Sequence, residues 1–305
     1  MKTHLVIGSR GSKLALVQAN FVKAELQREQ PSLTIEIEIV KTSGDGSSAP
    51  LSLIGGKGVF TKELEVALLE KRIDLAVHSL KDLPTIVPEG LTIAAICKRE
   101  DPRDALILRS GKKARSLRDL PAKAVVGTSS PRRLAQLKNV RADLEIKDLR
   151  GNVDTRLRKL DEGQYDALIL ACAGLRRLGL EKRISAPLPA SEMVPAVGQG
   201  ALALQTRVDD LETIALLSKL DHKFTRLACT AERAFLRLLG GGCQLPIAGH
   251  AVVREKRIRL VGIISSPDGS RVIRDRVVGG LDEAEALGTQ LAEKLLEQGA
   301  KDLLS

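Results

Sequence analysis

Hydrophobic and polar positions follow two alternating rhythms along the first two thirds of the chain. Short apolar runs, typical of buried or half-buried strands, are separated by segments whose apolar residues recur at helical spacing. Residues 33–40, LTIEIEIV, alternate with period two, whereas residues 13–30 form one amphipathic helical segment that ends before Pro31. Strands joined by helical crossovers predict α/β domains with mostly parallel sheets.

This strand and helix pattern occurs twice. Residues 6–18, VIGSRGSKLALVQ, resemble residues 125–137, VVGTSSPRRLAQL, and IDLAV at 73–77 resembles YDALI at 165–169. Each copy has a strand, a turn rich in Gly, Ser and Thr, and a basic residue near the start of a helix. The repetition predicts two similarly built α/β domains that face one another and bind ligands at the carboxyl ends of their strands.

The pattern changes near residue 220. A helix over residues 224–240 is followed by three strand segments, two of them joined by the turn SPDGS, and by an amphipathic helix over residues 284–298. This order predicts a small C-terminal α+β domain. The predicted domains are residues 1–100 together with 199–220, residues 101–198, and residues 221–305.

The charge balance narrows the class of partner. The 305 residues include 48 Lys and Arg against 38 Asp and Glu, a net charge of +10. Such a surface suits nucleic acid, an anionic membrane or a small acidic ligand, although it can also be a solvated face without a partner. There is no Trp, one Tyr and four Phe, so few side chains can stack on bases. The arginines occur in short separated motifs, which favours pockets for carboxylates or phosphates.

Cysteine usage and hydropathy indicate the compartment. No apolar run is long enough for a membrane span, and the first residues lack the apolar core of a secretory signal. The four cysteines, Cys97, Cys172, Cys229 and Cys243, are widely spaced and form no CxxC pair. This spacing argues against a zinc site, a redox dithiol and a disulfide framework, so we expect no metal and a cytoplasmic protein.

Arginines stand near three predicted helix starts. Arg132 and Arg133 follow the hydroxyl-rich turn Gly127–Ser130, Arg150 and Arg156 flank the turn after the next strand, and Arg10 lies in the turn Ser9–Ser12. A helix N-terminus attracts anions, and a guanidinium group pairs with carboxylate or phosphate. Ser and Asn also serve as ordinary helix caps. Three such turns together predict a polyanionic ligand in the cleft between the two α/β domains.

Two further places carry candidate chemistry. The strand that includes His78 delivers Lys81 and Asp82 into the loop beyond it, where Asp82 could act as acid and base or stabilise a cation. An ordinary ion pair at the strand end is the alternative, and we expect His78 to be structural. Cys243 follows three glycines in GGGCQLP, without the partners that a metal site, disulfide or cysteine protease needs. A buried small side chain or a covalent tether remains.

Eight ordered motifs resemble one known family over nearly the whole chain. They are SRGSKLAL (9–16), GGKGVFTKELE (55–65), DLAVHSLKDLP (74–84), REDPRDA (99–105), GTSSPRR (127–133), LRGNVDTRL (149–157), MVPAVGQGAL (193–202) and GGGCQLPIAG (240–249). The chain thereby resembles hydroxymethylbilane synthase, also called porphobilinogen deaminase. It departs from common family residues at Ser9, Leu53 and Pro131, and at neither Cys243 nor Asp82.

The resemblance implies a fold of two α/β domains like type II periplasmic binding proteins plus a small α+β domain. It implies a transferase that condenses four porphobilinogens, with release of ammonia, on a dipyrromethane cofactor joined by a thioether to Cys243. Asp82 is then the catalytic acid. The residues implied to bind cofactor or substrate are Arg10, Ser12, Lys57, Ser79, Lys81, Thr128, Ser129, Ser130, Arg132, Arg133, Arg150, Arg156 and Gln199.

Under this interpretation the enzyme is a monomer whose partner is porphobilinogen, with no nucleic acid or membrane. Each pyrrole unit carries an acetate and a propionate, so the growing chain gains negative charge that the arginines can bind. Residues 41–60, rich in Gly and Ser, are expected to form a mobile loop. Two alternatives stay open: a non-catalytic anion-binding protein with the same two domains, and a basic nucleic-acid-binding protein.

Overall fold

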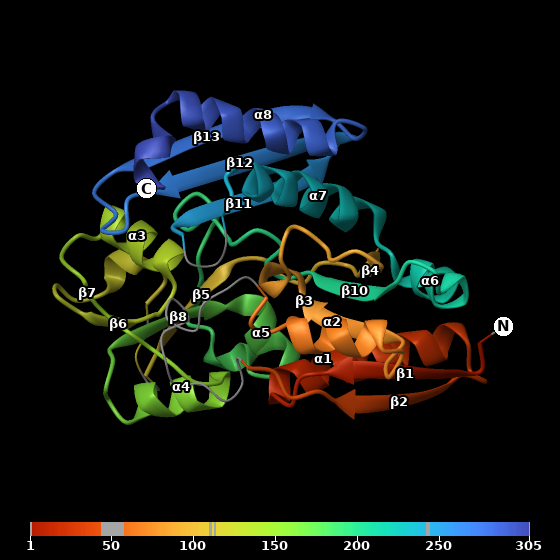
Figure 1. The fold of residues 1–305 in the computed structure, drawn as a ribbon. Helices are drawn as coiled ribbons and strands as arrows, with labels where there is room; N and C mark the ends of the chain where they lie inside the picture. The colour runs from red at the N-terminus through yellow and green to blue at the C-terminus, as the bar shows by residue number, and fades with distance from the viewer. Residues whose placement is uncertain (1, 44–57, 110–111, 113, 242–244, 305) are drawn as a thin grey trace. The chain divides into compact units, whose positions relative to one another are not determined.

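The computed structural model describes residues 2–43, 58–109, 112, 114–241 and 245–304 (Figure 1). The chain divides into two compact units, the first made of Met1–Glu100 and Ala201–Arg226 and the second of Asp101–Gly200 and Leu227–Ser305. The predicted boundaries of three domains stay a prediction. In the described part of the chain, no helix is both long and apolar enough to cross a membrane.

The first unit is built on a five-stranded sheet with the order β2-β1-β3-β10-β4. Its strands are β1 (His4–Ser9), β2 (Thr34–Ile39), β3 (Leu75–Ser79), β4 (Leu91–Ile96) and β10 (Leu202–Arg207). β1 pairs in parallel with β2 and β3, whereas β10 lies antiparallel between β3 and β4. The sheet is therefore mixed, and the prediction of mostly parallel sheets is wrong for half of its pairings.

Helices α1 (Lys13–Glu29), α2 (Lys62–Leu69) and α6 (Leu211–Leu217) belong to this unit. The apolar stripe of α1 packs with the central strands in one core, and α2 packs on β3 in a second. The helix α1 begins after Ser12, whose hydroxyl accepts a hydrogen bond from the Ala15 N–H at 3.3 Å. The segments predicted from periodicity are thus confirmed here.

The second unit repeats the same strand order in another five-stranded sheet, β7-β6-β8-β5-β9. Its strands are β5 (Asp104–Leu108), β6 (Val125–Gly127), β7 (Glu145–Lys147), β8 (Ala167–Ala171) and β9 (Ala186–Pro187), and its helices are α3 (Pro131–Val140), α4 (Val153–Asp161) and α5 (Cys172–Arg177). β6 is parallel to β7 and β8, and β5 lies antiparallel between β8 and β9. The internal repetition in the sequence correctly predicted two similarly built sheets.

A smaller α+β part completes the second unit. An antiparallel sheet of β11 (Ile247–Arg254), β12 (Arg257–Ser265) and β13 (Val272–Gly280) is packed against α8 (Ala284–Glu297) and α7 (Lys223–Leu238), as Figure 1 shows. Phe235 of α7 is completely buried and fills the core above Gly249 and Gly262 of the sheet. The predicted fold class, two similarly built α/β parts plus a small α+β part, is confirmed.

Candidate functional site

Arg132 and Arg133, in the first turn of α3, share one buried carboxylate. The Arg132 guanidinium donates to Asp104 Oδ2 at 2.7 Å, and that of Arg133 donates to Asp104 Oδ1 at 2.7 and 3.0 Å. Each guanidinium also donates to a backbone carbonyl, that of Val194 or of Ile169. The strand β5 supplies Asp104 and α3 supplies both arginines, so these contacts join α3 to the sheet.

The charges of the pair determine the ionisation of Asp104. Burial alone would raise the pKa of this carboxyl, but the positive charges and hydrogen bonds of Arg132 and Arg133 hold the pKa well below its ordinary value. Asp104 is therefore ionised at every working pH. Two guanidinium groups and one carboxylate leave a net positive charge in a buried place, and such a charge favours an anionic neighbour.

Arg150 and Arg156 extend this positive region along the turn before α4. Burial, together with the charges of Arg133 and Arg150, lowers the pKa of Arg156 to about 10, although Asp148 opposes the shift. Arg150 donates to Asp148 Oδ2 at 2.8 Å, and Arg156 donates to the Gly151 carbonyl at 2.7 Å. Burial is the main cause of the lowered pKa, and the charges of Arg133 and Arg150 add a repulsion that a carboxylate-rich ligand would relieve.

The hydroxyl groups predicted beside these arginines are mostly engaged in the fold. Ser129 Oγ donates to the Leu149 carbonyl at 2.6 Å and accepts from the Leu149 N–H at 3.0 Å. Thr128 is buried, and its hydroxyl accepts from the Ser130 N–H at 3.2 Å. Ser130 and Asn152 occupy the N-cap positions of α3 and α4, yet neither side chain makes a capping hydrogen bond. Both helix N-termini therefore keep their attraction for an anion.

Asp82 lies in the first unit, at the end of the 3₁₀ turn η1 (Leu80–Asp82) that directly follows β3. Its side chain is half-buried, as is that of Lys81. Over the residues that the structure describes, the Asp82 carboxylate makes no hydrogen bond or ion pair. The alternative of an ordinary ion pair at the strand end is thus not supported, and Asp82 is available for a ligand.

Other predicted residues of the first unit have structural partners. Ser79 Oγ exchanges hydrogen bonds with the Gln18 amide, and the guanidinium of Arg10 lies 4.1 Å above the ring centre of Phe60. His78 is buried and contacts Gln205 Oε1 at 2.9 Å. Burial, with a contribution from the charge of Arg10, lowers the pKa of His78 to about 4, so the ring is neutral, as expected of a structural histidine.

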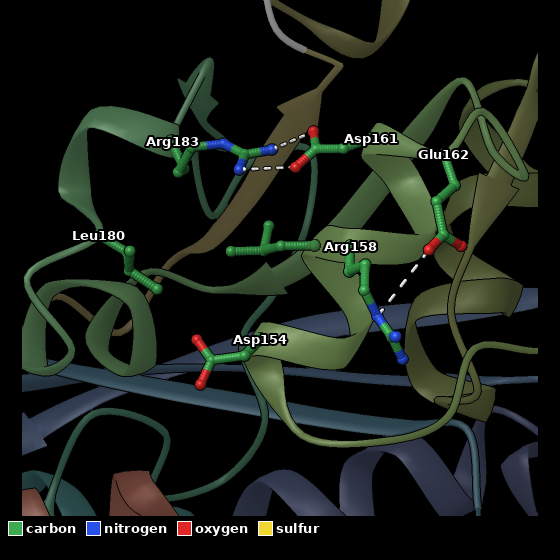
Figure 2. A pocket seen from close by; sticks show the side chains of 7 residues that line it. Asp154, Arg158, Asp161, Glu162, Leu180 and Arg183 are labelled. Carbon is green, nitrogen blue, oxygen red and sulfur yellow. Dashed lines mark hydrogen bonds and ion pairs between the residues drawn. The ribbon is translucent and has the colours of Figure 1, made fainter.

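A cavity of about 520 Å³ lies elsewhere in the second unit, along α4 (Figure 2). Leu157 and Leu180 form its apolar part, while Arg183 pairs with Asp161 at 2.7 Å on one side. None of its lining side chains belongs to the predicted set. The cavity is therefore separate from the arginine turns, although the same helix, α4, borders both.

Cys243, Lys57 and most of the predicted loop 41–60 lie outside the described residues. Cys97, Cys172 and Cys229 are all buried, and burial raises the pKa of the Cys172 thiol to about 12. Those three thiols are inaccessible to a bulky group. Within the described ranges, no cluster of three or more His, Cys, Asp or Glu side chains could hold a metal ion.

Sequence reasoning missed Asp104 and Glu232, both completely buried. Asp104 was part of the motif REDPRDA but received no role, and Glu232 looked like an ordinary helical residue. The available signal was an acid at the head of the apolar run DALIL, since a buried charge needs partners. Nothing local in the sequence marks Glu232.

Two family models together match most of the chain. The family model described as "Porphobilinogen deaminase, dipyromethane cofactor binding domain" matches residues 5–215, and "Porphobilinogen deaminase, C-terminal domain" matches residues 226–297. Among solved structures, the second substrate-binding domain of a putative amino acid ABC transporter from Streptococcus pneumoniae is 15% identical, with a TM-score of 0.46, covering 77% of this chain and 94% of its own.

Curated relatives match the chain from end to end. A porphobilinogen deaminase of Chlorobium phaeovibrioides is 50% identical over 310 residues, covering 100% of this chain and 98% of the relative. Another, from Nostoc sp., is 50% identical over 300 residues, covering 98% of this chain and 93% of the relative. The chain therefore belongs to the porphobilinogen deaminase family, the transferases that build a linear tetrapyrrole from porphobilinogen on a dipyrromethane cofactor.

Proposed function

We propose that this chain performs the family reaction with Asp82 as its catalytic group, Cys243 as the attachment point of the cofactor, and the arginines of both units as carboxylate-binding groups. Four porphobilinogens are joined head to tail, one ammonia leaves with each addition, and hydrolysis releases hydroxymethylbilane. The proposed binding arginines are Arg10, Arg132, Arg133, Arg150 and Arg156.

The observation that carries the proposal is the concentration of positive charge at the arginine turns of the second unit. Arg132, Arg133, Arg150 and Arg156 lie in these turns together with the carboxylates of Asp104 and Asp148, and the pKa of Arg156 is lowered by burial and by the charges of Arg133 and Arg150. Each pyrrole unit brings two carboxylates. A guanidinium binds a carboxylate through two parallel hydrogen bonds, which fixes both position and orientation.

Asp82 is suited to the bond-breaking step because its carboxylate is half-buried and unpaired within the described residues. When the carbon–nitrogen bond of the protonated aminomethyl group breaks, ammonia leaves with the electron pair, and the methylene carbon becomes cationic with its charge shared by the pyrrole ring. A carboxylate that accepts a hydrogen bond from the pyrrole N–H stabilises this cation. The same group can take up the ring proton lost after the new carbon–carbon bond forms.

Cys243 is proposed as the attachment point by elimination as well as by family motif. Cys97, Cys172 and Cys229 are buried in the two units, so a dipyrrole bound there would disrupt the cores around them. When bound, the dipyrromethane supplies the pyrrole carbon to which the first substrate unit is joined.

The test is the variant Asp82→Asn, which keeps the size of the side chain. It should fold and carry cofactor by intact mass, but its turnover of porphobilinogen should fall by about 100-fold or more, the range of general acid–base catalysis. Asp209→Asn is a matched control, because Asp209 is exposed in the same unit. Turnover of Asp82→Asn close to that of the control would remove Asp82 from the chemistry.

We further propose that the enzyme is a cytoplasmic monomer with porphobilinogen as its partner and neither nucleic acid nor membrane. The placement of its arginines in short, separated turns supports a small anionic ligand over nucleic acid, and the monomer is what the family resemblance implies. Size-exclusion chromatography with light scattering tests the monomer, and steep salt-dependent binding to random DNA would favour the nucleic-acid alternative.

A further inference from the structure

Asp104, the acidic residue that contacts both Arg132 and Arg133, has no assigned part in the reaction. Asp104 is completely buried, so its carboxylate is out of reach of any ligand. Its two oxygens nevertheless accept hydrogen bonds from both guanidinium groups and from the Gln199 amide at 3.0 Å. An acid of this kind acts through its partners or serves stability alone.

Geometry favours action through the arginines. Arg132 approaches Asp104 with two nitrogens, at 2.7 and 3.2 Å, and Arg133 approaches with two others, at 2.7 and 3.0 Å. Pairs of contacts on each guanidinium fix its plane as well as its position. Asp104 also compensates the repulsion between two buried cations, and it leaves one net positive charge for an incoming carboxylate.

Gln199 contacts Asp104 directly, and Glu232 holds the residue that precedes Gln199. The Gln199 amide nitrogen donates to the Pro102 carbonyl at 2.7 Å as well as to Asp104, and its side chain is only 1% exposed. The preceding Gly198, whose φ is +72°, donates its N–H to Glu232 Oε2 at 2.7 Å. Gln199, which the family resemblance predicts to bind ligand, is thus buried and contacts Asp104.

Glu232 connects this chain of contacts to the segments on either side of the cysteine motif. It lies on α7, which precedes residues 242–244, and its other oxygen accepts from the Ala251 N–H of β11, which follows them, at 2.7 Å. One carboxylate thus ties the helix before Cys243 and the strand after it to the turn that carries Gln199. Through the peptide bond between Gly198 and Gln199, these contacts connect α7 to Asp104 and its two arginines.

We propose that Asp104 is a positioning residue, held by Gln199, that sets the orientation and net charge of the Arg132–Arg133 pair for carboxylate binding. This inference rests on the proposed carboxylate-binding role of the two arginines. It differs from a purely structural role in one measurable way: loss of Asp104 changes cofactor loading and substrate affinity of the folded protein, and not only its stability.

The test is Asp104→Asn in the full chain, compared with wild type and with Asp143→Asn. Asp143 is the matched control because it also holds an arginine, Arg141, by two contacts at 2.7 and 2.8 Å, at the surface of the same unit. In folded Asp104→Asn, the fraction carrying a dipyrrole by intact mass should fall by about tenfold or more, the loss typical when a partner that orients a binding group is removed. The KM for porphobilinogen of the loaded fraction should rise, with kcat less affected.

Folded Asp104→Asn with wild-type loading and KM would overturn the inference, as would an equal loss in Asp143→Asn. If Asp104→Asn does not fold, Gln199→Met decides: it preserves all charges and removes one donor to Asp104, and it should raise KM, whereas an unchanged KM overturns the inference. The double variant Arg132→Gln, Arg133→Gln separates the two proposals. If this variant loads and turns over normally, the proposed role of the pair fails; if it is defective while Asp104→Asn is normal, only the inference fails.

Discussion

Gly288 offers a test of the packing that supports the cysteine-bearing part of the fold. On α8, this glycine faces α7 so closely that an added Cβ would lie 2.6 Å from the Ala234 Cβ and 2.8 Å from the Phe235 backbone nitrogen, and nearer still to the Ala231 carbonyl oxygen. Backbone atoms cannot rotate away as a flexible side chain can. Gly288→Ala must therefore push the two helices apart.

Two effects of opposite sign determine the magnitude. Replacing glycine by alanine inside a helix stabilises the helix by about 1 kcal/mol. Overpacking a core costs about 1–3 kcal/mol. Because the added Cβ would clash with backbone atoms beside the completely buried Phe235, we expect a cost at the upper end of this range. The net expectation is a loss of about 2 kcal/mol in the free energy of unfolding, which lowers the Tm of a unit of this size by roughly 4–8 °C.

The assay is thermal unfolding followed by circular dichroism, with Gln290→Ala as the control on the exposed side of the same helix. The control should shift the free energy of unfolding by less than about 0.5 kcal/mol. If Gly288→Ala keeps or raises the Tm, helix propensity outweighs packing at this site, and the close approach of α7 and α8 is refuted.

Three further predictions concern ionisation, thiols and a charge network. Burial lowers the pKa of His78 from 6.5 to about 4, so between these pH values the unfolded chain binds a proton that the folded chain does not. The free energy of unfolding should therefore fall by about 3 kcal/mol as the pH drops from 6.5 to 4. Acid-unfolding curves of His78→Gln should lack this decrease. A thiol reagent should detect three of the four cysteines in the unfolded protein, since the proposed thioether blocks Cys243, and four would contradict the tether. Lys2→Met removes the ammonium group that donates to Asp74 at 2.8 Å and to Asp210 at 3.0 Å. Urea unfolding should show that the free energy of unfolding falls by about 1.5–3 kcal/mol. An unchanged urea midpoint would mean that Arg207 alone neutralises the two acids.

Periodicity predicted the local elements well because burial on one face leaves a repeating trace in the sequence. The bounds of α1 and α8 agree with the predicted segments 13–30 and 284–298 to within a residue. Periodicity could not predict that β10 enters the first sheet antiparallel, because this strand returns from residues 202–207, far along the chain from its neighbours β3 and β4. Pairings of this kind depend on topology, which a local pattern does not contain.

The candidate site was predicted where residue types cluster in sequence and missed where partners are distant. Arg132 and Arg133 stood out because they follow a hydroxyl-rich turn, but their shared carboxylate, Asp104, comes from a strand 28 residues earlier. The contact between Gly198 and Glu232 spans 34 residues and uses a backbone N–H, which has no sequence signature. Contacts between residues so far apart in sequence can be identified only from the folded structure.

The most direct test of the central claim, a dipyrromethane carried by Cys243, is the intact mass of the freshly purified protein, followed by peptide mapping. The mass should exceed that of the 305 amino acids by one dipyrrole, and the addition should map to the peptide that contains Cys243 and be absent from Cys243→Ala. A protein with the unmodified mass that still converts porphobilinogen at full rate would contradict the account.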